Sequence, residues 1–239
     1  MTASACFRAL PGGLVLLVLL ATAFEVMATS EHKLDSAAFR QNIGAPLPEV
    51  AFRDQHGGEV TLPELAADKP LVLVLSWFEC PNLCPMVLDN LAATIGELPF
   101  EAGEFRVAVV SIDPEETPET AQALARELAR RRGDLTEHWS FLTGGPEAID
   151  RTASAAGFEY AYDRERDSYA HPAGLLVVSP GGTINRYLFG VEPQTPDLRL
   201  ALLEASEGEL GSAADQVVLR CYRFDPDSGR YNLAVMRLV

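Results

Sequence analysis

Apolar and polar residues follow two different periods along this chain, and the periods predict where its strands and helices lie. Pro70–Trp77 and Phe105–Ile112 are nearly continuous apolar runs, which is typical of strands buried on both faces of a sheet. Thr117 and Pro118 favour the start of a helix, and Pro180-Gly-Gly182 predicts a turn between two strands. The expected strands are 48–54, 59–62, 70–77, 105–112, one starting at 139, 174–179 and 183–189, and the expected helices are 62–67, 86–98, 117–132, 146–156 and 195–207.

The order of these elements predicts an α/β domain with helices on both faces of one central sheet. Strands and helices alternate at the start, so the first strands should run parallel, whereas the late hairpin makes the sheet mixed. This is the order of a thioredoxin-like, three-layer sandwich, preceded here by an N-terminal hairpin that turns at His56-Gly-Gly58. We expect the domain to span residues 43–207.

Both ends of the chain are expected to lie outside that domain. Residues 1–30 contain the apolar stretch Gly13–Phe24, which predicts a cleaved export signal or an N-terminal membrane anchor. Residues 31–42 are mostly polar and predict a linker, and residues 208–239 predict an appendage with a turn at Asp225–Gly229, outside the core. The body of the protein is therefore expected at the periplasmic face of an inner membrane or an equivalent site, anchored or soluble, where thiols meet oxidising conditions.

The composition limits the kinds of partner that the chain can have. It has 239 residues, 48% of them hydrophobic, which is enough for one domain with a sizeable core. Its formal net charge of −15 at pH 7 argues against nucleic acid or an anionic membrane surface as the main partner. A solvated acidic surface accounts for this charge.

The most informative residues are Cys80 and Cys84, which lie between a predicted buried strand and a predicted helix. Two thiols four positions apart can meet on one face of a helix's first turn. A helix N-terminus favours negative charge and so raises the thiolate fraction. Thiolates bind soft metals such as Cu(I) or Zn, and they also exchange disulfides. The pair therefore predicts either a metal site or a redox site.

A metal held by two thiolates needs a further ligand, and histidine is the expected type. His171 lies just before the strand predicted at 174–179, and in a thioredoxin-like sheet the loop entering that strand faces the N-terminus of the cysteine-bearing helix. His32 falls in the linker, His56 in a turn, and His138 before a strand, where structural roles are expected. His171 is therefore the candidate third ligand.

Three segments together resemble the SCO/SenC family, and the resemblance spans about 43–205. They are Phe78-Glu-Cys-Pro-Asn-Leu-Cys-Pro85, Val110-Ser-Ile-Asp-Pro-Glu-Glu-Thr-Pro118 and Tyr169-Ala-His171. The resemblance implies a thioredoxin-like, membrane-tethered chaperone that holds copper, as Cu(I) or Cu(II), on Cys80, Cys84 and His171. It also implies an upstream copper donor and delivery to the CuA site of cytochrome c oxidase subunit II. Asn82 stands where the family commonly has Asp, which removes a charge but no ligand.

Other functions remain open from the residues alone. A thiol–disulfide oxidoreductase would use the same cysteines to reduce the oxidase subunit or another exported protein, and it does not require His171. A peroxidase is disfavoured because two cysteines lie so close together. Met86 is expected to fill core space rather than bind metal. The carboxylates of Glu115 and Glu116 are expected in a loop that caps the following helix.

The tail carries one further motif, Cys221-Tyr-Arg-Phe-Asp-Pro226. It is similar to a stretch after which some family members continue into a C-terminal membrane segment, of which only Leu233–Met236 gives a hint here. The tail is either truncated before such a segment or has another role. Cys221 itself is expected to be a small buried residue, and the alternatives are a partner thiol or an additional metal ligand.

Overall fold

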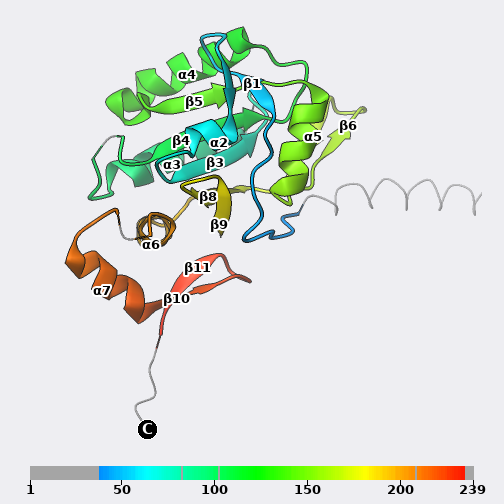
Figure 1. Cartoon of the computed structure of the whole chain (residues 1–239). Helices are drawn as coiled ribbons and strands as arrows, with labels where there is room; N and C mark the ends of the chain where they lie inside the picture. The colour runs from blue at the N-terminus through cyan, green and yellow to red at the C-terminus, as the bar shows by residue number, and fades with distance from the viewer. Residues whose placement is uncertain (1–37, 82, 102, 208, 235–239) are drawn as a thin grey trace, which may run out of the picture.

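The computed structural model describes residues 38–234 except 82, 102 and 208 (Figure 1). Residues 1–30, which predict an export signal or anchor, lie outside the described residues. None of the helices within the described part has the length and apolar character needed to cross a bilayer.

The strands are β1 Ala51–Arg53, β2 Glu59–Thr61, β3 Leu71–Ser76, β4 Arg106–Ser111, β5 Trp139–Leu142, β6 Ala161–Asp163, β7 Ser168–Ala170, β8 Gly174–Ser179, β9 Thr183–Phe189, β10 Tyr222–Asp225 and β11 Arg230–Leu233. The helices are α2 Leu62–Leu65, α3 Leu83–Gly96, α4 Pro118–Arg132, the short 3-10 helix η1 Gly133–Thr136, α5 Pro146–Ala155, α6 Thr195–Ala205 and α7 Ala213–Cys221.

Five strands form the central sheet, in the order β5-β4-β3-β8-β9. The strands β3, β4 and β5 are parallel, whereas β8 runs antiparallel to β3 and β9 runs antiparallel to β8. The mixed sheet predicted from the sequence is confirmed, as is the N-terminal hairpin, in which Ala51 pairs with Thr61. Crossover helices follow β3 and β4 because parallel neighbours need a long connection.

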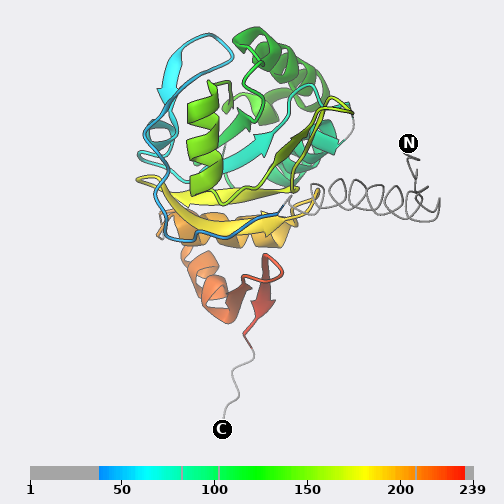
Figure 2. The ribbon, with the colours of Figure 1, turned by 90° about the vertical axis from the view of Figure 1, so that its right-hand side faces the viewer.

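Side chains of the sheet alternate between two hydrophobic cores, one on each face. Val72 and Val74 of β3 pack with apolar residues of α3, α4 and α6, whereas Leu71 and Leu73 pack with residues of α2, α5 and β1. Each of these fully buried aliphatic side chains contributes roughly 2 kcal/mol of hydrophobic stabilisation. The helices on the two faces give the predicted three-layer, thioredoxin-like sandwich (Figure 2).

The two outer strands of the sheet have part of their free edges occupied by side chains or backbone from elsewhere. At β5, Gln55 accepts from the Phe141 N–H through Oε1 at 2.9 Å and donates from Nε2 to the Trp139 carbonyl at 3.1 Å. At β9, the Gly44 N–H donates to the Ile184 carbonyl at 2.8 Å, and neighbouring backbone bonds continue this pairing.

The segment 31–42 was predicted as a linker, but its described part, 38–42, packs on the domain. The Arg40 N–H donates to the Gly157 carbonyl at 2.7 Å, and the Glu159 N–H donates to the Ala38 carbonyl at 2.9 Å. Phe39 places its ring among the rings of Phe158, Tyr187 and Phe189. Phe39, an aromatic residue in a mostly polar segment, thus extends the domain. Residues 38–47 are called the N-terminal arm.

The tail is a folded appendage whose anchoring residues belong to the core, contrary to the expectation that it lies outside. Residues 209–234, called the C-terminal appendage, comprise α7 and the β10–β11 hairpin beside α6 (Figure 2). Leu210 and Tyr231 are buried in the core on the α6 side. The Tyr231 N–H donates to the buried carboxylate of Asp197 at 2.8 Å, which anchors the hairpin to the start of α6.

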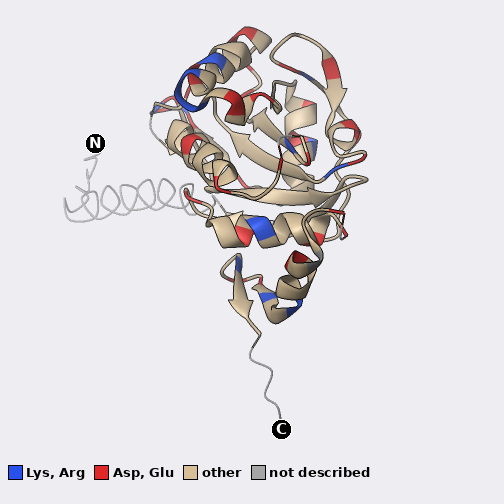
Figure 3. Cartoon of the chain, turned by 90° about the vertical axis from the view of Figure 1, so that its left-hand side faces the viewer, with Lys and Arg blue, Asp and Glu red and all other residues tan. Residues whose placement is uncertain are grey.

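Charged residues are distributed unevenly over the surface. Asp and Glu occur on most elements, and three consecutive arginines, Arg130–Arg132, form the last turn of α4 (Figure 3). The basic last turn of α4 complements the helix dipole, and Arg131 and Arg132 both bind the Asp89 carboxylate on α3 at 3.0 Å. These arginines therefore join two helices on one face of the sheet.

Candidate metal site

Cys84 and His171 meet in this structure, although 87 positions separate them along the chain. Cys84 lies in the first turn of α3, and His171 lies in the loop between β7 and β8. Their Sγ and Nε2 atoms are 3.3 Å apart. The Cys84 side chain is only 3% exposed, whereas His171 is half-buried. The topology of the sheet thus brings together two of the three predicted ligands.

The tautomer of the neutral His171 ring follows from the contact of its Nδ1 atom. Its Nδ1 lies 3.0 Å from the Pro172 carbonyl oxygen, which can only accept a hydrogen bond. Nδ1 must therefore carry the proton, so in the neutral ring Nε2 offers a lone pair toward Cys84. A carbonyl that fixes the tautomer in this way is the usual partner of a metal-binding histidine. Nε2 of His171 is therefore the ring nitrogen that could act as a metal donor.

Cys80 lies outside the helix, which corrects the expectation that both thiols share the first helical turn. Helix α3 begins at Leu83, and Pro81 restricts the preceding residue to non-helical backbone. The Cys80 N–H instead donates to the Trp77 carbonyl at 3.3 Å. Cys80 is half-buried, whereas Cys84 is buried.

Cys80 and His171 both line a cavity of about 580 Å³. Trp77 and Tyr169 also line it. Within the described residues, no three His, Cys, Asp or Glu side chains already form a group able to hold a metal ion. Cys84 and His171 are in place, and Cys80 faces the same space from its loop. A shift of the Cys80 loop would be needed to close a three-donor site.

Aromatic side chains form the wall behind these donors. The Trp77 and Tyr169 rings lie 5.7 Å apart in an edge-on arrangement, and Phe158 lies 5.8 Å from the His171 imidazole. Burial and the nearby Asp113 carboxylate raise the pKa of Tyr169 above its ordinary value. The phenol is therefore neutral at physiological pH, and the wall presents apolar faces that restrict water and the motion of the histidine.

Glu116 lies closer to the site than the sequence indicated. Its carboxylate accepts from the Glu79 N–H at 2.8 Å and from the Ser111 hydroxyl. It is only 7% exposed, and burial raises its pKa to about 7 despite these bonds. Glu116 lies in the loop that leads to the Thr117 N-cap of α4, as expected, and its carboxylate also ties the residue next to Cys80 to the end of β4.

This buried carboxyl should make stability depend on pH. The folded pKa of about 7 lies above the ordinary 4.5, so Glu116 favours folding below pH 4.5, and this contribution is lost as pH rises through 7. In Glu116→Gln, which cannot ionise, the loss of stability between pH 5 and 8 should shrink by about 2 kcal/mol, or about 5 °C in Tm.

Thermal unfolding at both pH values measures this difference. The exposed neighbour Glu115 provides the control, since Glu115→Gln removes the same charge and should leave the slope near that of the wild type. Equal flattening in both variants would contradict a special role for Glu116 and would point to general repulsion among carboxylates.

The other described residues considered from the sequence are exposed. Met86 is 43% exposed on α3, so it does not fill core space as expected. Cys221 is exposed, which corrects the expectation of a buried residue, and its Sγ contacts the Val217 carbonyl at 3.6 Å. His56 is exposed in the β1–β2 turn. His32 lies outside the described residues.

Comparison with known proteins agrees with this fold. Residues 21–201 match the SCO1/SenC family. A protein of Stutzerimonas stutzeri, named as a candidate copper-binding protein, is 28% identical over 146 residues, which cover 59% of this chain and 68% of that protein.

Two solved structures show the same fold. The copper-bound structure of Arabidopsis thaliana ScoI has a TM-score of 0.56 and 22% identity, and the match covers 68% of this chain and 97% of that one. BsSco, whose structure is described as that of a cytochrome c oxidase assembly protein with a disulfide switch, has a TM-score of 0.57 and 21% identity over 70% of this chain and 98% of its own. Because the family match covers most of the chain and the fold agrees with it, this protein belongs to the SCO1/SenC family.

Proposed function

We propose that this protein is a copper chaperone that binds one copper ion through Cys80, Cys84 and His171. The observation that carries the proposal is the 3.3 Å approach of Cys84 Sγ to His171 Nε2, with the ring held in the tautomer that leaves Nε2 free. Cys80 completes the donor set when its loop closes over the shared cavity. Family membership and the copper-binding name of the Stutzerimonas relative support copper as the metal.

The donor set suits a metal ion that is transferred to another protein. Thiolate sulfur and imidazole nitrogen select Cu(I) over hard cations. Three ligands on one side of the ion leave the other side open, so an acceptor's ligands can replace them one at a time. Cys80, half-exposed and in a loop, is the donor best placed to release first.

The proposed acceptor is the CuA domain of cytochrome c oxidase subunit II, with an upstream donor that loads the protein. The oxidase-assembly role ascribed to BsSco supports this choice. Leu83, Met86 and Tyr162 are 42–44% exposed although they are large and apolar. Leu83 lines the cavity of Cys80 and His171, so we propose that the acceptor docks there. The protein would act after export, tethered or soluble, at the periplasmic face of the membrane.

Anaerobic titration of the reduced protein with Cu(I), in competition with a chromophoric chelator, tests this function. We expect one tightly bound Cu(I) per chain and a loss of at least 100-fold in affinity for Cys84→Ser, since each ligand of a metal site supplies on the order of 3 kcal/mol. Cys221→Ser is the matched control and should bind as the wild type does. Equal affinity in all three proteins would refute the proposed site.

Thiol–disulfide exchange is the second candidate function, and the unequal exposure of the two cysteines favours it. The accessible Cys80 thiolate would attack a disulfide of the partner and form a mixed disulfide. The buried Cys84 thiolate would then displace the partner, which leaves as a dithiol, while a Cys80–Cys84 disulfide forms. The two electrons come from this cysteine pair, so an external reductant must restore it.

A further inference from the structure

A column of aromatic rings runs from the C-terminal appendage to His171. Phe189, at the end of β9, lies 5.6 Å from Phe39 of the N-terminal arm. Phe39 lies 5.4 Å from Phe158, and Phe158 lies 5.8 Å from the His171 imidazole. We call Phe189, Phe39 and Phe158 the aromatic column. It places the imidazole at one end of a continuous packed stack.

The other end of the column packs against the turn of the β10–β11 hairpin. Gly229 has a φ of +63° and lies so close to β9 that an added Cβ would be 2.7 Å from Phe189 Cδ2 and 3.0 Å from the Tyr187 carbonyl oxygen. Only glycine fits here without displacing the Phe189 ring. The N-terminal arm meets the same turn, because Gln41 Nε2 donates to the Pro226 carbonyl at 2.6 Å.

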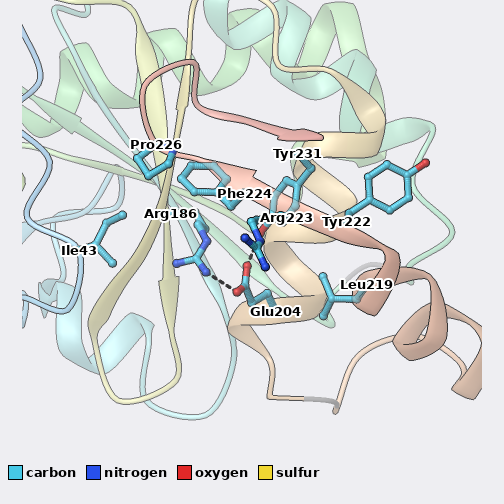
Figure 4. A pocket seen from close by; sticks show the side chains of 9 residues that line it. All are labelled: Ile43, Arg186, Glu204, Leu219, Tyr222, Arg223, Phe224, Pro226 and Tyr231. Atoms are coloured by element: carbon cyan, nitrogen blue, oxygen red, sulfur yellow. Dashed lines mark hydrogen bonds and ion pairs between the residues drawn. The ribbon is translucent and has the colours of Figure 1, made fainter. Parts of the chain in front are cut away.

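A partly buried polar cluster holds the hairpin in this position. Glu204 of α6 binds both the Arg186 guanidinium and the Tyr231 hydroxyl, beside a cavity of about 320 Å³ (Figure 4). Arg186 also lies 5.0 Å from the centre of the Phe224 ring. These contacts hold the hairpin against β9 and α6.

The backbone supplies a second connection between β9 and the histidine loop. The Gly190 N–H, one residue after Phe189, donates to the Ala173 carbonyl at 3.0 Å, two residues after His171. Gly174 pairs with Phe189 in the sheet, and a Cβ at Gly174 would come within 3.0 Å of Phe39. A shift of Phe189 would therefore displace the other rings of the aromatic column and the loop that carries His171.

We propose that the C-terminal appendage positions His171, by holding the aromatic column and the β9 end in register with the histidine loop. The inference rests on the proposed function only in taking His171 as a copper ligand. The residues that support a ligand typically change metal affinity by 10- to 100-fold when altered. Gly229, Phe189, Phe39 and Phe158 are positioning residues in this sense, since none of them offers a donor to the metal.

The test compares Gly229→Ala with Gly181→Ala in the whole protein. Both glycines have positive φ, but a Cβ at Gly181 in the β8–β9 turn would meet nothing within 4 Å. Two quantities are measured: the NMR resonances of the His171 ring in the metal-free protein, and the affinity for Cu(I). We expect Gly229→Ala to shift the ring resonances and to weaken Cu(I) binding about tenfold, and Gly181→Ala to leave both at wild-type values.

Phe189→Leu repeats the test with a smaller disturbance if Gly229→Ala does not fold. If Gly229→Ala or Phe189→Leu lowers Tm while the His171 resonances and the copper affinity stay unchanged, the appendage only stabilises the fold and the proposal is overturned. His171→Ala separates the two ideas. If His171→Ala keeps full copper affinity, the proposed metal site fails. The His171 ring resonances of Gly229→Ala, compared with those of the wild type, still report whether the appendage positions the ring.

Discussion

Replacing His171 by alanine should lower the affinity of the reduced protein for Cu(I) by about 100-fold, because one of three ligands is lost. The imidazole is held by the Pro172 carbonyl and the Phe158 ring and directs Nε2 at Cys84, so no other donor within the described residues replaces it. Disulfide exchange by Cys80 and Cys84 should continue, since that chemistry needs only the two sulfurs. Chelator competition and the rate of reduction of a model disulfide measure the two effects separately.

His56→Ala is the control for this experiment, since His56 is exposed in the β1–β2 turn, far along the chain from the site. It should leave both measurements unchanged. Copper affinity that survives in His171→Ala, together with slower disulfide exchange, would reverse the assignment and favour an oxidoreductase in which His171 assists the thiols.

Gly157→Ala should be the most destabilising of the glycine substitutions, lowering Tm by about 10 °C, or roughly 3 kcal/mol. Gly157 has a φ of +56°, and an added Cβ would overlap the Arg40 carbonyl oxygen, which is backbone and cannot turn aside. The N-terminal arm would have to move away, which would break the 2.7 Å bond from the Arg40 N–H to Gly157. Thermal unfolding and proteolysis of the arm measure the result.

Gly145→Ala, twelve residues earlier, is the matched control. Gly145 precedes α5 with a negative φ of −71°, and a Cβ there would meet no other atom within 4 Å. Its Tm should stay within about 2 °C of the wild type. If Gly157→Ala unfolds at the same temperature as this control, the arm is not fixed to the domain as described.

The central sheet could be predicted because its burial leaves a clear trace in the sequence. Leu71–Ser76 and Arg106–Ser111 are buried along almost their whole length, so polar residues are nearly absent from them. The β6–β7 hairpin left no such trace, since its six residues are half-buried or exposed and include Tyr, Asp and Ser. Short strands at the surface follow their contacts rather than a hydrophobic pattern.

Helix α7 is encoded by a local signal at its start. Ser212 and Asp215 form a capping box, with each side chain bonded to the backbone N–H of the other residue. That spacing is a recognised start of a helix. The run Val217-Val-Leu219 favours a strand instead, because β-branched residues have high strand propensity.

The site could be predicted in part, for reasons that lie in its residues. The meeting of Cys84 and His171 follows from the order of strands, so the topology was enough to predict it. The offset of Cys80 could have been inferred from Pro81, which disfavours helix at the residue before it. The contacts of Glu116 with Glu79 and of Phe39 with Phe158 join segments far apart in the chain. No local pattern encodes them.

The occupied sheet edges restrict how other proteins can attach to this one. Gln55 already satisfies backbone groups of β5, and the N-terminal arm already pairs with β9 at Ile184. An incoming strand would have to displace these bonds before it could extend the sheet, so strand addition by a partner or by a second copy is disfavoured. An acceptor would therefore have to recognise side chains instead of backbone. Crowded copies should also resist the edge-to-edge pairing that begins β-aggregation.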